Sequence, residues 1–180
     1  MNPDHRIDFI VTTDASTVRK IGQYPSVADL SFPELKDYRK VISENDMREM
    51  RRAIGLHAQG IGVGSYAYLR RILERMIDKA KDMAVEDGNN ILDDYNQKKI
   101  VDRIKLLKDY LPKVLVNNSV VYGIISKGIH ELSEEECVEY FPVLKTCIMM
   151  ILEEWEQKRK QTEQERQLSD SLSKIKSKVN

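Results

Sequence analysis

Residues 65–86, Ser-Tyr-Ala-Tyr-Leu-Arg-Arg-Ile-Leu-Glu-Arg-Met-Ile-Asp-Lys-Ala-Lys-Asp-Met-Ala-Val-Glu, decide the fold class of this chain. Their apolar side chains recur at the i, i+3, i+4, i+7 spacing that gathers them on one face of a helix. These side chains are Leu69, Ile72, Leu73, Met76, Ile77, Ala80 and Met83. Ser65 is the candidate N-cap, and Gly88 stands just beyond the last periodic residue. The stretch therefore predicts one long amphipathic helix.

The same helical period recurs on both sides of this stretch. Proline is tolerated in the first turn of a helix, so Pro33 marks one start, and Ser43 with Asp46 three residues later marks another. Proline cannot continue a helix because it lacks the backbone N–H, so Pro112 marks a stop. The helices predicted in this way span residues 33–42, 44–58, 94–111 and 117–130.

The last part of the helical region begins at a capping box. Ser133 and Glu136 have the spacing at which each side chain accepts a hydrogen bond from the backbone N–H of the other residue. This spacing predicts a short helix, and Pro142 is expected to open or kink a long helix after it. The apolar face of that helix would consist of Leu144, Ile148, Ile151, Leu152 and Trp155. Residues 33–155 therefore form a predicted helical bundle.

The N-terminus follows a different period. Between Arg6 and Thr12 apolar residues alternate with polar ones, which is typical of a strand, and Thr17 to Ile21 has the composition of a returning strand. An isolated two-stranded hairpin is marginally stable in water, so this one is expected to dock on the helices, to pair with another chain, or to belong to a longer N-terminal domain. Residues 1–32 are therefore a predicted hairpin and loop.

The apolar face disappears beyond Trp155. Residues 156–167 contain no apolar side chain and cannot pack on the bundle. Residues 156–180 are therefore expected to form a projecting polar helix or a mobile tail. Its last apolar residues recur at a spacing that suits contact with a helix of a protein partner. They are Leu168, Leu172, Ile175 and Val179.

The composition sets the broad class. The chain has 180 residues, 41% of them hydrophobic, which is enough for one sizeable core. Its 29 basic and 29 acidic residues cancel, so net charge points neither to nucleic acid nor to an anionic membrane. Without a transmembrane run or a signal peptide, a cytoplasmic protein is expected. Cys137 and Cys147 would lie about 15 Å apart on one helix and stay reduced. His5 and His57 lack partners at metal-ligand spacing, so neither a metal nor a cofactor is expected.

Three glycines precede the 65–86 helix, in Gly60-Ile-Gly-Val-Gly-Ser65. Backbone N–H groups at a helix N-terminus attract anions, so a phosphate site is one interpretation. The segment follows a helix and lacks the spacing of a P-loop or a dinucleotide-binding fingerprint. Glycines also let two helices approach closely, so a tight helix connection is the other interpretation.

Two arginines and a glutamate share the polar face of the same helix. Arg70 and Glu74 are four residues apart, and Arg71 and Glu74 are three apart, so one carboxylate is expected beside two guanidinium groups. The cluster is either an ordinary set of surface ion pairs or a phosphate-binding site in which Glu74 orients the arginines.

The 117–130 helix carries the main candidate for chemistry. Tyr122, Ser126 and His130 are four residues apart and would share a polar stripe. His130 can serve as general acid or base, Ser126 and Tyr122 supply hydroxyl groups, and Lys127 can neutralise a phosphate. Alternatively, Lys127 and His130 complement the negative end of the helix dipole and have a structural role.

Four helical features follow one another over about residues 62–155. They are a helix with Leu-Arg-Arg-Ile-Leu-Glu at 69–74, a helix ending in Asp-Tyr-Leu-Pro at 109–112, a helix closing on Ser-Lys-Gly-Ile-His-Glu at 126–131, and a final packing helix. This order resembles the HEPN superfamily of prokaryotic helical domains. The resemblance implies a dimeric helical domain of a defence, toxin–antitoxin or RNA-processing system, and its active members are metal-independent endoribonucleases.

The resemblance makes His130 the counterpart of the motif histidine, and Arg71 with Glu74 the counterparts of the first-helix pair. In the ribonuclease members four to six residues separate an arginine from the histidine. This chain has Gly-Ile-Ile there, at 123–125, and lacks the motif arginine. Two functions are therefore expected: an HEPN-like domain that binds or cleaves RNA or nucleotides, or a non-catalytic interaction or dimerisation module. A homodimer is expected in both.

Overall fold

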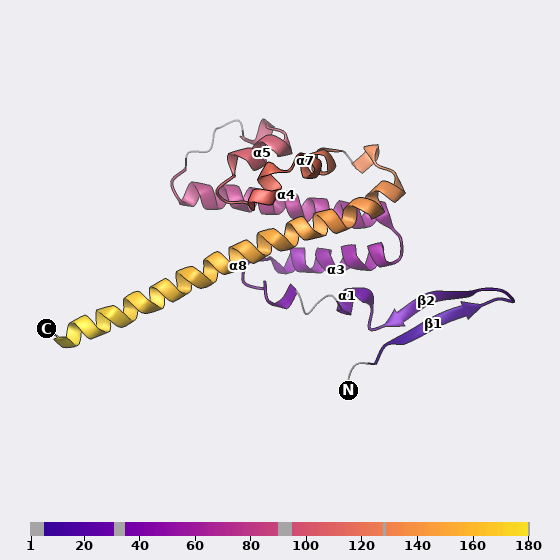
Figure 1. Cartoon of the computed structure of the whole chain (residues 1–180), viewed down its shortest axis with the longest axis horizontal. Helices are drawn as coiled ribbons and strands as arrows, with labels where there is room; N and C mark the ends of the chain where they lie inside the picture. Colours follow the sequence, from indigo (N-terminus) through magenta and orange to yellow (C-terminus); the bar gives the residue numbers. More distant parts are fainter. Residues whose placement is uncertain (1–5, 31–34, 90–94, 128, 180) are drawn as a thin grey trace.

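A computed structural model describes residues 6–30, 35–89, 95–127 and 129–179 of the chain. In these ranges the protein is mainly α-helical, with a two-stranded hairpin at the N-terminus and a long helix at the C-terminus (Figure 1). The predicted fold class is confirmed.

Three helices make the core. α3 (Glu44–Ala58) and α4 (Gly62–Glu86) lie side by side, and α8 (Glu134–Val179) packs along α4 (Figure 1). The short turn between α3 and α4 contains Gly60, whose φ of 76° favours glycine. The predicted face of α4 is buried, including Leu69, Ile72 and Leu73. Burial of this face is the main term that favours folding.

Shorter helices cover the other side of α4. They are η1 (Tyr95–Gln97), α5 (Ile100–Leu106), α6 (Lys113–Asn117), α7 (Ser119–Ser126) and η2 (Ile129–Glu131). The predicted 94–111 and 117–130 helices were too long, and α6 was not predicted. Leu107, Leu111 and Leu115 are all buried. The chain turns before α6 because Pro112 lacks a backbone N–H and disfavours a helical conformation at Leu111.

The prediction of a helix over 33–42 was wrong for most of its length. Pro33 lies outside the described residues, and residues 37–42 form turns. Leu35, Val41 and Ile42 are nevertheless buried, and the Tyr38 hydroxyl donates to Glu153 of α8 at 2.6 Å. Tertiary packing therefore holds this segment without a helix. The short helix α1 (Val27–Leu30), which precedes it, was not predicted.

One continuous helix, α8, replaces the two predicted around Pro142. The capping box at its start is confirmed: Glu136 N donates to Ser133 Oγ at 3.2 Å, and Ser133 N donates to Glu136 Oε2 at 2.9 Å. Pro142 lies inside the helix, where it removes one backbone bond. The buried apolar face beyond it, from Leu144 to Trp155, compensates for that loss. With 46 residues, α8 is about 70 Å long and projects from the bundle (Figure 1).

The N-terminal hairpin consists of β1 (Asp8–Thr13) and β2 (Val18–Tyr24), which pair antiparallel. The side chain of Asp14 closes the turn by accepting from Ser16 N at 3.0 Å and Thr17 N at 2.9 Å. Every residue of β1 is exposed. The hairpin lies beside the bundle rather than packed into it (Figure 1).

Candidate functional site

The predicted polar stripe does not form one helical face. α7 ends at Ser126, whose hydroxyl donates to Gly123 O at 3.2 Å, and His130 lies in the separate turn η2. The His130 side chain is 82% exposed, and its Nε2 lies 3.7 Å from Glu131 Oε1. The backbone of Tyr122 lies in α7, but its side chain is outside the described part of the structure. Because α7 ends at Ser126, His130 does not lie on the helical face that carries Ser126.

Lys127 links this segment to the start of α8. Its Nζ lies 3.2 Å from Glu136 Oε1 and 5.5 Å from the centre of the Tyr140 ring. The hydrogen bond to Glu136 raises the pKa of Lys127 above its ordinary value. Lys127 is thus a fixed cation at the α7–α8 junction.

Arg70 caps the C-terminal end of α7. Its guanidinium donates to the backbone carbonyl of Lys127 and lies 3.0 Å from Glu74 Oε1, while the Tyr66 hydroxyl donates to Ile124 O at 2.8 Å. The last carbonyls of a helix lack partners within that helix, so both contacts stabilise the end of α7. The structure therefore brings Arg70, Glu74 and Lys127 together, in an arrangement that supports a structural role.

Arg71 leaves this group and reaches α3. Its Nη1 lies 3.4 Å from Glu49 Oε1, and its side chain is 57% exposed. The predicted pairing of Glu74 with both arginines is therefore incorrect: the Glu74 carboxylate pairs with Arg70. On a helix, consecutive residues point about 100° apart, so Arg70 and Arg71 serve different neighbours.

An ionic cluster between α3 and α4, with two nearly buried carboxylates, was not predicted. Arg75 donates to Asp46 Oδ1 at 2.7 Å and to the carboxylate of Glu49, and both acids are nearly buried. Burial by itself would raise the pKa of Glu49, but the hydrogen bond and charge of Arg75, with the charge of Arg71, lower it overall. Asp46 and Glu49 at i, i+3 on α3 and Arg75 on α4 were visible in the sequence. Their pairing was not, because it depends on how the two helices align.

The N-terminus of α4 already holds an anion from the chain itself. The backbone N–H groups of Gly62 and Val63 donate to the carboxylate of Glu134. Ser65 is not the N-cap, since its hydroxyl donates to Gly62 O at 2.8 Å inside the helix. An added Cβ at Gly62 would lie 2.9 Å from Val138 Cγ2. These contacts support close packing of α4 on α8, and Glu134 takes the place that a phosphate would need.

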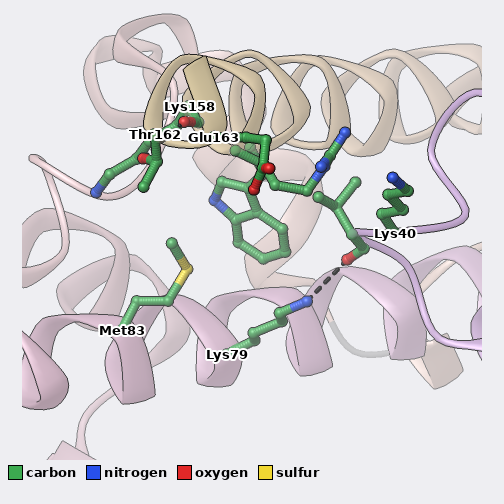
Figure 2. Close-up of a pocket in the computed structure, with 9 residues that line it drawn as sticks. Lys40, Lys79, Met83, Lys158, Thr162 and Glu163 are labelled. Carbon is green, nitrogen blue, oxygen red and sulfur yellow. Dashed lines mark hydrogen bonds between the residues drawn. The ribbon is translucent and has the colours of Figure 1, made fainter. Parts of the chain in front are cut away.

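A cavity opens where α8 leaves the bundle, with a volume of about 360 Å³. We call it the basic cleft (Figure 2). It is lined by Lys40, Val41, Lys79, Met83, Trp155, Lys158, Arg159, Thr162 and Glu163. Sequence reasoning missed it because its residues come from three segments that are distant along the chain.

A second surface feature is the set of exposed apolar side chains on the hairpin, which we call the hairpin patch. It consists of Phe9, Ile10, Val11, Val18, Ile21 and Tyr24. Ile10 is 62% exposed and Val18 72%. Within the described ranges the sheet has two strands only, so β1 and β2 each leave one edge unpaired.

The comparisons with known proteins identify no relative. No family model, no curated protein and no solved structure matches the chain. Among the described residues no group of His, Cys, Asp and Glu is arranged to hold a metal ion. Within the same residues, no helix has the length and apolar character needed to cross a membrane.

Proposed function

We propose that this protein is a non-catalytic interaction module that assembles as a homodimer, with the β1 strands of two chains paired edge to edge. The observation that carries this proposal is the hairpin patch on a two-stranded sheet with unpaired edges. Such a hairpin is marginal alone in water. Pairing with a second hairpin would extend the sheet to four strands and remove apolar surface from water.

The outer edge of the hairpin belongs to β1. A cavity between the bundle and the hairpin is lined by residues 20–23 of β2, by Gly55 and Ala58 of α3, and by Gln59, which caps the C-terminal end of α3. β2 is therefore the strand nearer to the bundle, and β1 has the open side (Figure 1). A second chain can approach β1 without meeting the helices.

The charges also favour pairing through β1. An antiparallel β1–β1 pair centred on Ile10 sets Asp8 opposite Thr12 of the other chain, and no like charges face each other. A β2–β2 pair would carry four cationic side chains near its centre, Arg19 and Lys20 of each chain. The two Lys20 side chains would be diagonal neighbours on one face, and their repulsion makes the β1 edge the better fit for a second copy.

Sedimentation equilibrium of wild type and two matched variants tests the proposal. Wild type is expected at twice the 20.9 kDa chain mass. Ile10→Lys places two like charges at the centre of the β1–β1 pair and should give the monomer at the same concentration, with unchanged helical circular dichroism. Val18→Lys makes the same change on β2 and should keep the dimer. A monomeric wild type, or equal masses for the two variants, would contradict the proposal.

The projecting helix is a competing dimer contact that the same assay separates. Leu168, Leu172 and Ile175 are exposed on α8, as the predicted partner-binding stripe requires. Deleting residues 164–180 should leave the dimer intact if β1 carries it, and should give the monomer if the α8 stripe carries it. A protein partner bound through this stripe remains a prediction.

The second candidate is a cytoplasmic HEPN-like domain of a defence or toxin system that acts on RNA. It is favoured by the Arg70–Lys127 contact, which holds the arginine-bearing face of α4 against the segment that ends in the exposed His130. Incubation with labelled single-stranded RNA tests it. Cleavage by wild type that His130→Ala abolishes, while His5→Ala preserves it, would support this candidate, and no cleavage by wild type would overturn it.

A further inference from the structure

The basic cleft is not used by the dimer proposed above. Lys40 and Val41 come from the segment before α3, Lys79 and Met83 from α4, and the other lining residues from α8. Figure 2 shows Lys40, Lys79 and Lys158 on three sides of the opening. Three separate elements thus each contribute a lysine to the cleft lining.

The positive charge in the cleft is only partly compensated. Arg159 is neutralised by Glu156, which its guanidinium contacts twice at 2.8 Å. Glu163 also lines the cleft, and its charge is paired with Arg166, which does not line the cleft, at 3.2 Å. Lys79 and Lys158, by contrast, have no carboxylate within ion-pair distance among the described residues. Lys79 donates instead to Val41 O at 2.8 Å. The cleft therefore has cationic groups that are available to an anion.

The floor of the cleft is apolar. Trp155 is 5% exposed, and its indole N–H donates to Tyr110 O at 3.3 Å, which fixes the ring. Lys79 Nζ lies 5.0 Å from the centre of that ring, and Met83 lines the same cavity. An aromatic and a thioether side chain form a surface on which a flat apolar group can pack.

We propose that the basic cleft binds a small phosphorylated molecule with an aromatic group, the phosphate against Lys40, Lys79 and Lys158 and the aromatic group against Trp155 and Met83. The volume of about 360 Å³ lies within the range of small-molecule pockets. Ammonium groups from three elements recognise phosphate through charge-assisted hydrogen bonds. A purely apolar ligand would leave them without a partner.

Tryptophan fluorescence tests the proposal directly, because Trp155 is the only tryptophan in the chain. ADP is the probe, with adenosine, pyrophosphate and a single-stranded RNA as separate arms, and titration calorimetry gives the affinities. ADP is expected to change the Trp155 emission saturably and to bind at least about tenfold more tightly than adenosine or pyrophosphate. Losing a charged contact costs about tenfold or more, so Lys79→Gln should weaken ADP binding by that factor.

Lys160→Gln is the matched control. Like Lys79→Gln, it removes one positive charge from the protein. Lys160 lies on α8 but does not line the cleft, and its Nζ lies 3.7 Å from Glu156 Oε1. This variant should bind ADP as wild type does, and urea unfolding confirms that both variants fold. The proposal is overturned if millimolar ADP gives no saturable change, if both variants weaken binding equally, if pyrophosphate binds as tightly as ADP, or if RNA binds and ADP does not.

Discussion

Replacing Gly62 with alanine is expected to destabilise this protein, although the same replacement stabilises most helices. Gly62 is the first residue of α4 and is buried against α8. An added Cβ would overlap the backbone carbonyl of Glu134 and lie 2.9 Å from Val138 Cγ2 and 3.0 Å from Cys137 Cβ. Because the overlapping atom is backbone, α4 and α8 would have to move apart where Glu134 caps α4.

The size of the effect follows from two opposing terms. Overpacking of a close contact costs about 1–3 kcal/mol. Alanine regains up to about 1 kcal/mol over glycine inside a helix, and less at its first residue. If the capping bonds to Glu134 also lengthen, about 1 kcal/mol is lost in addition. The net expectation is a loss of about 2 kcal/mol. With a urea dependence of about 2 kcal/mol per molar, the unfolding midpoint falls by about 1 M.

Gly123→Ala in α7 is the control, measured by the same urea unfolding. No atom lies within 4 Å of an added Cβ at Gly123, and its φ is not positive. This variant should gain about 0.5–1 kcal/mol. The two substitutions are therefore expected to have opposite signs. A midpoint for Gly62→Ala at or above that of wild type would show that α4 and α8 are not in close contact at this point.

Three further predictions concern stability in urea. Arg75→Ala leaves the nearly buried carboxylates of Asp46 and Glu49 without their shared cation, and should lower the free energy of unfolding by about 1–2 kcal/mol at neutral pH. The loss should be smaller below about pH 4, where carboxylates become protonated. Arg71→Ala is the control, and should cost under about 0.5 kcal/mol because the Arg71 side chain is exposed. Burial lowers the pKa of His57, so the unfolded chain binds a proton at this side chain more readily than the folded one. The free energy of unfolding should therefore fall as the pH drops below about 6.5. His57→Phe keeps the stacking on Phe141 and should reduce that fall. Deleting 164–180 should leave the midpoint unchanged, because the described side chains of that segment are exposed.

The helices that the sequence predicted well are those with a long local period. The apolar stripe of α4 is complete within its own residues, so its face was predicted correctly. Its start was not, because the cap is Glu134, more than seventy residues away in the chain. Pro142 predicts a helix boundary because proline disfavours the interior of a helix. In the structure α8 continues through Pro142, and its packing along α4, which no local pattern shows, compensates for that local cost.

The candidate site shows the same limit. Spacing placed Arg70 near Glu74 correctly, since both lie on one helix. Spacing did not show that Arg70 caps α7, nor that His130 lies beyond a helix break. The basic cleft has no counterpart in any local pattern, because no single segment supplies more than part of its charge.

Hydrogen exchange of the β1 amides at two protein concentrations tests the proposed dimer most directly. At a concentration where wild type is dimeric, the Phe9–Thr12 amides that face the outer edge should exchange slowly, and dilution to the monomer should remove this protection while α4 amides stay protected. Equally fast exchange of the β1 amides at both concentrations, with a dimer present at the higher one, would contradict pairing through β1.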